Sequence, residues 1–155
     1  MNKSEQINEL ATALCNTQIG LKDVFKGTSG YGYNYATLDS VYDEIRPKMV
    51  LNGLSLTHEK SFNRETNTIE LRSLLMHTSG QWIEYYGSLP FAPMKQMNDY
   101  QASGSGFTYL ERYQTSAIFG ITSDEDNDGT EKKTESKPQS KSKSKATQTS
   151  SGDSW

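Results

Sequence analysis

The sequence has little of what would cross-link the chain, bind a metal through sulfur or span a membrane. Among its 155 residues there is one cysteine, Cys15, so neither a disulfide framework nor a pair of metal-binding cysteines can form within the chain. No apolar run approaches the roughly 18 residues of a membrane-spanning helix, and no apolar leader opens the chain. We therefore expect a soluble, intracellular protein without a membrane partner. Cys15 falls in an apolar helical pattern, which predicts a small buried residue.

Residue patterns for bond-making chemistry are also missing. The two histidines, His58 and His77, fall in different predicted strands without neighbouring cysteines or paired acids, which supports neither a metal site nor a general base. The Gly-Ser-Gly segment at 104–106 lacks the lysine of a phosphate-binding loop, and Tyr109 stands where a dinucleotide-binding motif has its third glycine. The sequence therefore predicts a binding protein with no catalytic residues, no resident metal and no cofactor.

An acidic run matches the pattern of a calcium-binding loop, with Asp124, Asp126, Asp128 and Glu135 at ligand positions and Gly129 at the turn. The surrounding residues do not fit such a loop. Glu131 occupies a position that is normally aliphatic, and the SKPQSKSK segment that follows cannot form the exit helix. A solvated acidic hinge is therefore favoured over a calcium site. A metal-dependent nuclease that uses the acids from Asp124 to Asp128 stays open as an alternative.

Charge and composition divide the chain into three parts. From Thr130 onward no aliphatic residue is larger than alanine, and such a segment cannot offset its chain entropy by burying apolar surface. We predict a folded core at 1–123, an acidic hinge at 124–129 and a disordered Lys/Ser-rich tail at 130–155. The tail holds six of the 16 basic and three of the 19 acidic residues, which leaves a net charge of −6 on the rest. An acidic core disfavours nucleic-acid binding unless its basic residues line a local groove.

The first half of the core alternates helix and strand patterns. Ser4 is the predicted N-cap of a first helix. The apolar face of this helix comprises Ile7, Leu10, Ala11 and Leu14. Tyrosines at 31, 33 and 35 alternate, which places them on one face of a strand. Thr37 is the predicted cap of a second helix, which Pro47 should kink or interrupt and Asn52-Gly53 should end.

The second half of the core predicts three strands and a helix. The strands lie at 54–62, 68–77 and 81–89, and the short connections between them favour an antiparallel meander. A last helix is predicted at about 100–119. The order of these patterns indicates an α+β domain, in which an antiparallel three-stranded meander plus an extra strand packs on helices that cover one face.

The tyrosine strand and the loop before it carry the first candidate binding residues. Tyr33 and Tyr35 offer rings on which bases could stack, and Lys22 and Lys26 precede them in a loop of small residues that could admit a nucleic-acid backbone. Alternating tyrosines are also good strand sequence with one buried face, so this pattern alone does not decide between binding and packing.

The last helix and the sheet supply the other candidates. Tyr109 and Arg112 lie one helical turn apart, so one helix face could hold a phosphate or a stacked base. The simpler interpretation is a helix packed tightly on the sheet, with Arg112 paired to an acid. Lys60 and Arg64 could face phosphates along one sheet edge, with Arg72 as a further basic residue, although scattered surface charges are most often only solvated.

Taken in order, these motifs resemble the ERF family of phage recombination proteins, which anneal single-stranded DNA. The matching segments are Tyr33-Asn34-Tyr35-Ala36-Thr37-Leu38, Arg46-Pro47, Asn52-Gly53-Leu54, His77-Thr78-Ser79-Gly80, Gly104-Ser105-Gly106-Phe107-Thr108-Tyr109, Arg112-Tyr113 and Phe119-Gly120-Ile121 before the acidic run. The resemblance covers most of residues 20–129. One departure is Glu111, where family members tend to have a second basic residue.

The resemblance implies an ATP-independent protein of phage homologous recombination that works in the cytoplasm of the bacterial host. It implies a Rad52-like β-β-β-α core, binding of single-stranded DNA and assembly as homo-oligomeric rings or filaments, with a phage exonuclease or single-strand binding protein as a further partner. We expect the DNA to contact Lys22, Lys26, Tyr33, Tyr35, Lys60, Arg64, Arg72, Tyr109 and Arg112. An adaptor that recruits a host replication protein through the charged tail or Trp155 stays open as an alternative.

Overall fold

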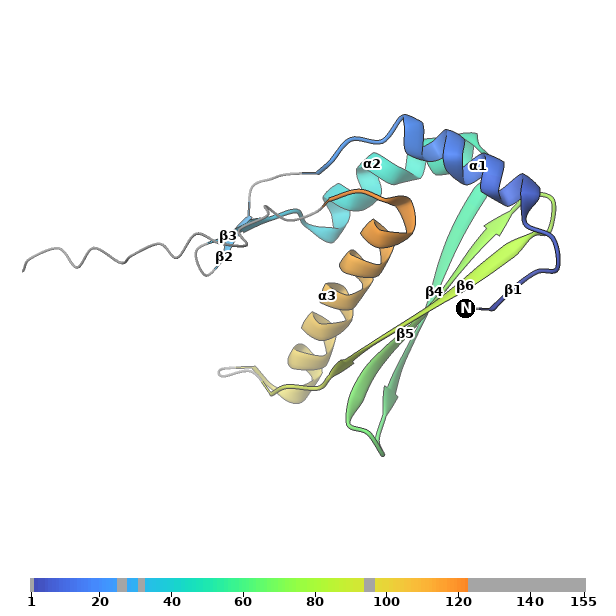
Figure 1. Ribbon diagram of the computed structural model, residues 1–155. Helices are drawn as coiled ribbons and strands as arrows, with labels where there is room; N and C mark the ends of the chain where they lie inside the picture. The colour runs from blue at the N-terminus through green and yellow to red at the C-terminus, as the bar shows by residue number, and fades with distance from the viewer. Residues whose placement is uncertain (1, 25–27, 31–32, 94–96, 123–155) are drawn as a thin grey trace, which may run out of the picture.

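The computed structural model describes residues 2–24, 28–30, 33–93 and 97–122, and it describes only the backbone of 28–30 and 33–35. Within these residues a four-stranded antiparallel sheet carries its helices on one face (Figure 1). This arrangement confirms the α+β class predicted from the order of the sequence patterns. The acidic hinge and the tail at 124–155 lie outside the described residues, so the division of the chain stays a prediction.

The meander consists of β4 (Leu54–Asn63), β5 (Thr68–His77) and β6 (Trp82–Pro90), and β1 (Asn2–Lys3) pairs with β6 to give the strand order β1-β6-β5-β4. The predicted strand bounds are confirmed to within one residue. The first turn contains Asn67 at a φ of 55° and the second contains Gly80 at a φ of 85°. Glycine adopts this left-handed backbone conformation without strain and asparagine tolerates it, which explains why the chain can reverse direction at these two turns.

Alternation along β5 separates the two faces of the sheet. Leu71, Ser73 and Leu75 are fully buried beneath the helices, whereas Arg72 points to the open face and is exposed. The helix α3 (Asp99–Phe119) lies across β5 and β6. Gly106 permits this close approach because a Cβ at that position would overlap Ile69 Cδ1. Of the small residues near the start of α3, Gly106 therefore serves to pack the helix closely on the sheet.

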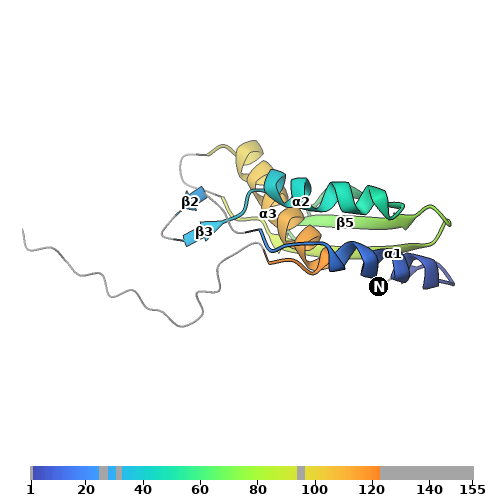
Figure 2. The same cartoon turned by 90° about the horizontal axis from the view of Figure 1, so that it is seen from above.

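Two further helices, α1 (Asn8–Ile19) and α2 (Leu38–Leu51), lie side by side over one end of the sheet, with α3 beside them (Figure 2). Five large apolar side chains are fully buried where the three helices meet the sheet, and they are Leu10, Val41, Ile45, Leu75 and Phe119. Burial of such a side chain contributes roughly 1.5–3 kcal/mol, so this junction is the main source of stability.

The ends of α2 and α3 follow the sequence signals. The Thr37 side chain accepts a hydrogen bond from the Ser40 N–H, which confirms it as the cap of α2. Asn98 and Gln101 bond reciprocally at the start of α3. Gly120 ends that helix in the left-handed conformation, with a φ of 67°.

The prediction that Ser4 caps the first helix is wrong. Its Oγ accepts the Trp82 N–H at 3.0 Å, and its own N–H donates to the Trp82 carbonyl at 2.9 Å, so Ser4 extends the pairing of β1 with β6. The cap of α1 comes from the sheet instead. The side-chain oxygen of Gln81 accepts the N–H groups of Glu9 and Leu10, at 2.9 and 3.0 Å.

The prediction for Cys15 is wrong, and so is the interruption of the helix expected as one outcome at Pro47. Cys15 is exposed, because the buried residues of α1 are Leu10, Ala13 and Thr17 and their spacing turns position 15 outward. Pro47 does not interrupt α2, which continues to Leu51. A proline removes one backbone hydrogen bond, and the apolar face of α2, buried in the core, offsets that loss.

The tyrosine segment is not the extra strand of the main sheet. It forms β3 (Tyr33–Tyr35), which pairs antiparallel with β2 (Thr28–Gly30) in a separate hairpin. This hairpin lies away from the four-stranded sheet, near the start of α2 (Figures 1 and 2). The strand that completes the main sheet is β1.

The segment after α3 is bound to the segment after α1. The Thr122 N–H donates to Asp23 Oδ1 at 2.9 Å, and the Thr122 carbonyl accepts the Val24 N–H at 3.1 Å. Ile121 is buried in the core beside this junction. The segment that follows α1 and the segment that follows α3 therefore meet at one side of the helical layer.

Candidate nucleic-acid interface

Arg112 joins the two segments that the sequence singled out. Its Nη1 donates to the Ala36 carbonyl at 3.1 Å, directly after β3. The guanidinium carbon lies 5.0 Å from the centre of the Tyr113 ring and 5.6 Å from that of Tyr109. The two rings are themselves 4.4 Å apart and tilted by 48°. Arg112, which lies against two aromatic rings of α3, therefore ties the chain directly after the tyrosine hairpin to the helix.

The members of this group differ in exposure. Arg112 is 7% exposed, so its guanidinium faces protein, and its observed contacts are those of an anchor. Tyr109 is 45% exposed, so part of its ring is open to a ligand from solvent. A base could stack on such a surface, which is worth about 1–3 kcal/mol per base in single-strand binding proteins.

A second group of polar side chains lies between α2, α3 and β4. Glu111 on α3 is largely buried, its Oε1 accepts the Tyr42 hydroxyl at 2.7 Å and its Oε2 lies 2.7 Å from Lys60 Nζ. Tyr42 also carries Arg46 over its ring, at 5.2 Å from the ring centre. The Glu111 carboxylate thus pairs with Lys60. Tyr42, which donates to the same carboxylate, also contacts Arg46.

The same group continues into the sheet through His58. Its Nε2 lies 2.9 Å from the Tyr42 hydroxyl, its Nδ1 lies 2.7 Å from Ser73 Oγ, and Ser73 accepts the Gln114 amide at 2.8 Å. Because the Tyr42 proton goes to Glu111, Nε2 must be the donor to Tyr42 and Nδ1 the acceptor from Ser73. We call these residues the polar cluster, and its members are Tyr42, His58, Lys60, Ser73, Glu111 and Gln114.

Three groups of the polar cluster have shifted pKa values. Burial disfavours the charge on Glu111, but the hydrogen bonds from Lys60 and Tyr42 outweigh it, so the pKa of Glu111 lies below its ordinary value. Burial lowers the pKa of His58, against the attraction of Glu111. Burial and the hydrogen bond to Glu111 raise the pKa of Tyr42. At neutral pH the cluster therefore holds an ionised Glu111 beside a neutral His58.

Comparison with known protein families identifies the family of this chain. The family model of the ERF superfamily matches residues 10–154. The chain belongs to the ERF superfamily. No curated protein and no solved structure is significantly similar to it. Membership implies a general function in phage recombination and single-strand annealing, and it confirms the resemblance carried by the sequence motifs.

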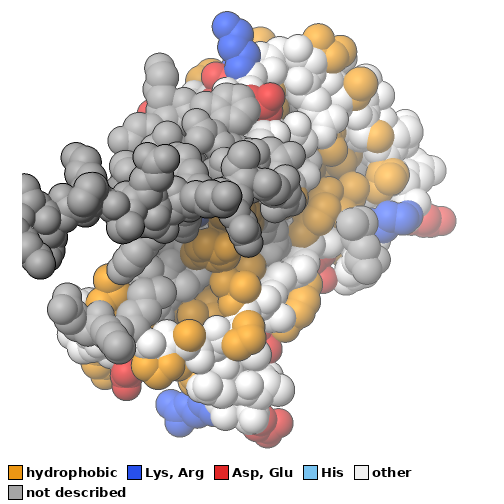
Figure 3. Space-filling model, turned by 60° about the vertical axis from the view of Figure 1, so that its left-hand side comes forward, with side chains coloured by type: hydrophobic (Ala, Val, Ile, Leu, Met, Phe, Trp, Pro, Cys, Tyr) orange, Lys and Arg blue, Asp and Glu red, His pale blue; other side chains and the backbone are white. Residues whose placement is uncertain are grey.

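The residues expected at an ERF DNA site are only partly brought together. Lys60 contacts Glu111 on α3, next to Arg112 in the same helix, and Tyr109 lies one turn before Arg112. Arg64 is exposed in the turn between β4 and β5. Positive charge is thus dispersed, and the view of Figure 3 shows hydrophobic side chains in a hollow, with separate Lys and Arg side chains near the margins, where Asp and Glu side chains also lie.

Two further basic residues of the expected site lie elsewhere. Lys22 is exposed after α1, where its backbone N–H donates to Glu44 Oε1 at 2.9 Å. Arg72 lies on the open face of the sheet and pairs with Glu59 and Glu84. The neighbouring carboxylates raise the pKa of Arg72, the hydrogen-bonded Glu84 most strongly.

Three of the expected contacts cannot be placed. Lys26 lies outside the described residues, and for Tyr33 and Tyr35 the structure gives the backbone of β3 only. The acids from Asp124 to Asp128 also lie outside the described residues. Within the described ranges, no group of three or more His, Cys, Asp or Glu side chains could hold a metal ion. None of the described helices is both long and apolar enough to cross a membrane.

Sequence reasoning missed Arg46, Tyr42 and His58 as neighbours of the expected site. Two signals could have found them. Tyr42 and Arg46 are four residues apart on one helix, so they share a face. His58 and Lys60 alternate on β4, which places both on the face that meets the helices.

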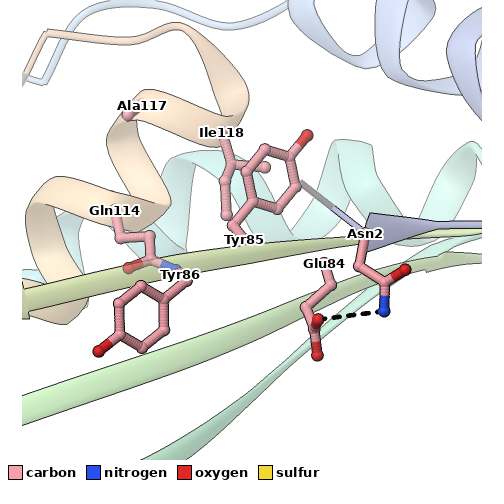
Figure 4. Close-up of a pocket in the computed structure, with 7 residues that line it drawn as sticks. All are labelled: Asn2, Glu84, Tyr85, Tyr86, Gln114, Ala117 and Ile118. Carbon is pink, nitrogen blue, oxygen red and sulfur yellow. Dashed lines mark hydrogen bonds between the residues drawn. The ribbon is translucent and has the colours of Figure 1, made fainter.

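A separate pocket of about 520 Å³ lies between β6 and α3 (Figure 4). Its lining residues are Asn2, Glu84, Tyr85, Tyr86, Gln114, Ala117 and Ile118, and none of them belongs to the expected DNA site. Gln114 is shared with the polar cluster, because the same amide that lines the pocket donates to Ser73. The pocket is therefore connected to the cluster, but it lies apart from Tyr109 and Arg112.

Proposed function

We propose that this ERF protein is an ATP-independent single-stranded DNA binding and annealing protein for phage homologous recombination. The observation that supports this most directly is the junction of the tyrosine hairpin with α3, where Arg112 binds the Ala36 carbonyl beside the exposed ring of Tyr109. This junction joins the two segments that carry the family motifs, and it offers the partly exposed aromatic surface of Tyr109.

In this mechanism the protein binds and positions strands, and the DNA supplies the driving force. Phosphates contact dispersed basic residues, for which Lys22, Lys26, Lys60, Arg64 and Arg72 are the candidates, while Tyr109 and the tyrosines of β3 stack on or space the bases. Arg112 contributes mainly by fixing the hairpin. Duplex formation yields about 1.4 kcal/mol per base-pair step, so annealing needs no nucleotide hydrolysis.

Assembly into rings or filaments would compensate for the low positive charge of one chain. A few basic residues per subunit then repeat along a continuous groove, which strengthens the field that a strand experiences. The sheet supports this proposal through its edges. Within the described part of the chain, β4 has no neighbour on its outer side, and the edge of β6 is paired only at Trp82, Ile83 and Glu84, by β1 and Ser4. Unpaired strand edges of this kind can accept a strand of another subunit.

The decisive experiment mixes two complementary labelled oligonucleotides with the protein in EDTA, without nucleotide, over a series of salt concentrations. Strong acceleration of annealing that fades with salt is the expected result, since phosphate contacts weaken as salt rises. No acceleration, together with no binding to single strands at low salt, would overturn the proposal and favour an adaptor role. Cleavage that appears only when a divalent ion is added would instead favour the nuclease.

A further inference from the structure

Lys60 is an expected DNA contact whose charge is already matched by a buried carboxylate. Its Nζ lies 2.7 Å from Glu111 Oε2, and the Lys60 side chain is 44% exposed whereas that of Glu111 is 9% exposed. The ammonium group therefore stands between solvent and a carboxylate inside the protein. A phosphate that approaches Lys60 from solvent also approaches Glu111.

The carboxylate is held in place from several sides. Its other oxygen accepts the Tyr42 hydroxyl, and Tyr42 is bonded in turn to His58. The residues on both sides of Glu111 in α3, Leu110 and Arg112, are buried as well. Glu111 therefore cannot turn away from Lys60 without leaving the Tyr42 hydroxyl without its acceptor, which costs about 1–3 kcal/mol for a buried polar group.

This arrangement reduces what Lys60 can contribute to DNA binding. A lysine strengthens binding to a single strand because it replaces condensed counterions on a phosphate. When a carboxylate already neutralises the ammonium, that gain is small, and the two anions that share one cation repel each other. The pair thus contributes less to affinity than a free lysine at the same position would.

We propose that Glu111 is an internal competitor of DNA phosphate at Lys60, and that it sets a low affinity of this face for single strands. The inference rests on the proposed function and assigns to Glu111 a role in tuning it. A weakly held strand can leave or shift its register, which a protein that pairs complementary strands requires.

The test compares the binding of the full chain to fluorescent oligo(dT) over a salt series for the wild type and Glu111→Gln. Glutamine keeps an acceptor for Tyr42 and removes the charge. The variant should steepen the slope of log K against log salt by about 0.7, the value for one added phosphate contact on a single strand. This corresponds to roughly a fivefold gain in affinity at 0.1 M salt relative to 1 M.

Two controls separate this effect from a change in overall charge. Glu5→Gln removes the same charge from an exposed residue before α1, and it should leave affinity and slope unchanged. Lys60→Gln should cancel the gain when it is combined with Glu111→Gln. If wild-type protein binds oligo(dT) but Glu111→Gln behaves like Glu5→Gln, or keeps its gain without Lys60, the inference is wrong and the proposed function stands. If wild-type protein does not bind at low salt, both are wrong.

A measurement on the wild type keeps the inference testable if Glu111→Gln does not fold. Acetylation of lysines, quantified by mass spectrometry with and without oligo(dT), reports which ammonium groups the DNA covers. Labelling of Lys60 should be the same in both samples, because its partner is Glu111. Clear protection of Lys60 by the oligonucleotide would overturn the inference.

Discussion

Two adjacent residues of β4, Glu59 and Lys60, form ion pairs on opposite faces of the sheet, and the two pairs differ in their exposure to solvent. On the helix-covered face Lys60 meets Glu111, whose side chain is 9% exposed. On the open face Arg72 meets Glu59, with side chains 53% and 68% exposed. Glu59 precedes Lys60 in β4, so strand alternation alone assigns each charge to its face. The Lys60–Glu111 pair is thus part of the packed structure on the helix-covered face, whereas the Arg72–Glu59 pair is solvated on the open face.

The sharpest test of this difference replaces Glu111 by alanine. The substitution removes the acceptor of both Lys60 and Tyr42, and the expected loss of unfolding free energy is about 3 kcal/mol, at the lower end for a broken buried pair because Lys60 is partly exposed. Urea unfolding monitored by circular dichroism measures it. A loss below about 1 kcal/mol would place this pair with exposed surface pairs and remove the distinction between the faces.

A second test compares exposed tyrosines on the two sides of the sheet. Tyr109→Ala should weaken oligo(dT) binding by about 1–3 kcal/mol if a base stacks on this ring. Tyr86 on the open face is 62% exposed, and Tyr86→Ala serves as the matched control with no expected change in affinity. Equal losses in fluorescence anisotropy titrations would show that the DNA does not distinguish the two sides.

A third test uses pH. The pKa of His58 is lowered in the folded protein, so as pH falls below about 6.5 the unfolded chain takes up the proton first and stability declines. The lowered pKa of Glu111 extends the decline to more acidic pH, since its contribution is present above 4.5 and is lost as pH falls through the folded pKa. Melting temperatures at pH 7.5 and 5.5 should differ less for His58→Gln than for the wild type.

The control for this pH test is the second histidine. His77 lies at the end of β5, where its ring bonds to Ser79, outside the polar cluster. His77→Gln should keep the pH dependence of the wild type. If it reduces the difference in melting temperature as much as His58→Gln, the polar cluster is not the origin of the acid sensitivity.

The smallest effect is expected on the open face. Arg72→Gln breaks its pairs with Glu59 and Glu84, and we expect almost no change in unfolding free energy because the guanidinium is solvated and exposed ion pairs contribute little. The same urea titration measures it. A loss as large as that of Glu111→Ala would mean that this network stabilises the sheet and that exposure does not separate the two faces.

Local signals in the sequence were sufficient for most of the fold. The turns at Asn67 and Gly80 and the cap at Thr37 depend on residues a few positions apart, and the strands and helices they delimit were predicted closely. Two of the errors came from distant contacts. Ser4 is hydrogen-bonded to Trp82, which lies 78 residues away in the sequence. Pro47 is tolerated because packing against the core stabilises α2.

The candidate site shows the same division between local and distant information. Alternation and helical spacing assign Lys60 and Glu111 to faces of their own elements, but neither pattern says which strand residue a helix residue will meet. That pairing depends on how α3 crosses the sheet, which Gly106 and Ile69 fix through contact over 37 positions. The anchoring of Ala36 by Arg112 depends on the same crossing.

The bonds between Thr122 and the Asp23–Val24 segment also bear on how the protein is made. A ribosome synthesises the residues of β1, α1 and the segment after α1 before it synthesises their partners, which lie in β6 and after α3. During synthesis the nascent chain therefore keeps part of the apolar side of α1 uncovered until α3 has left the exit tunnel. We expect this stage of biogenesis to be the one most dependent on chaperones.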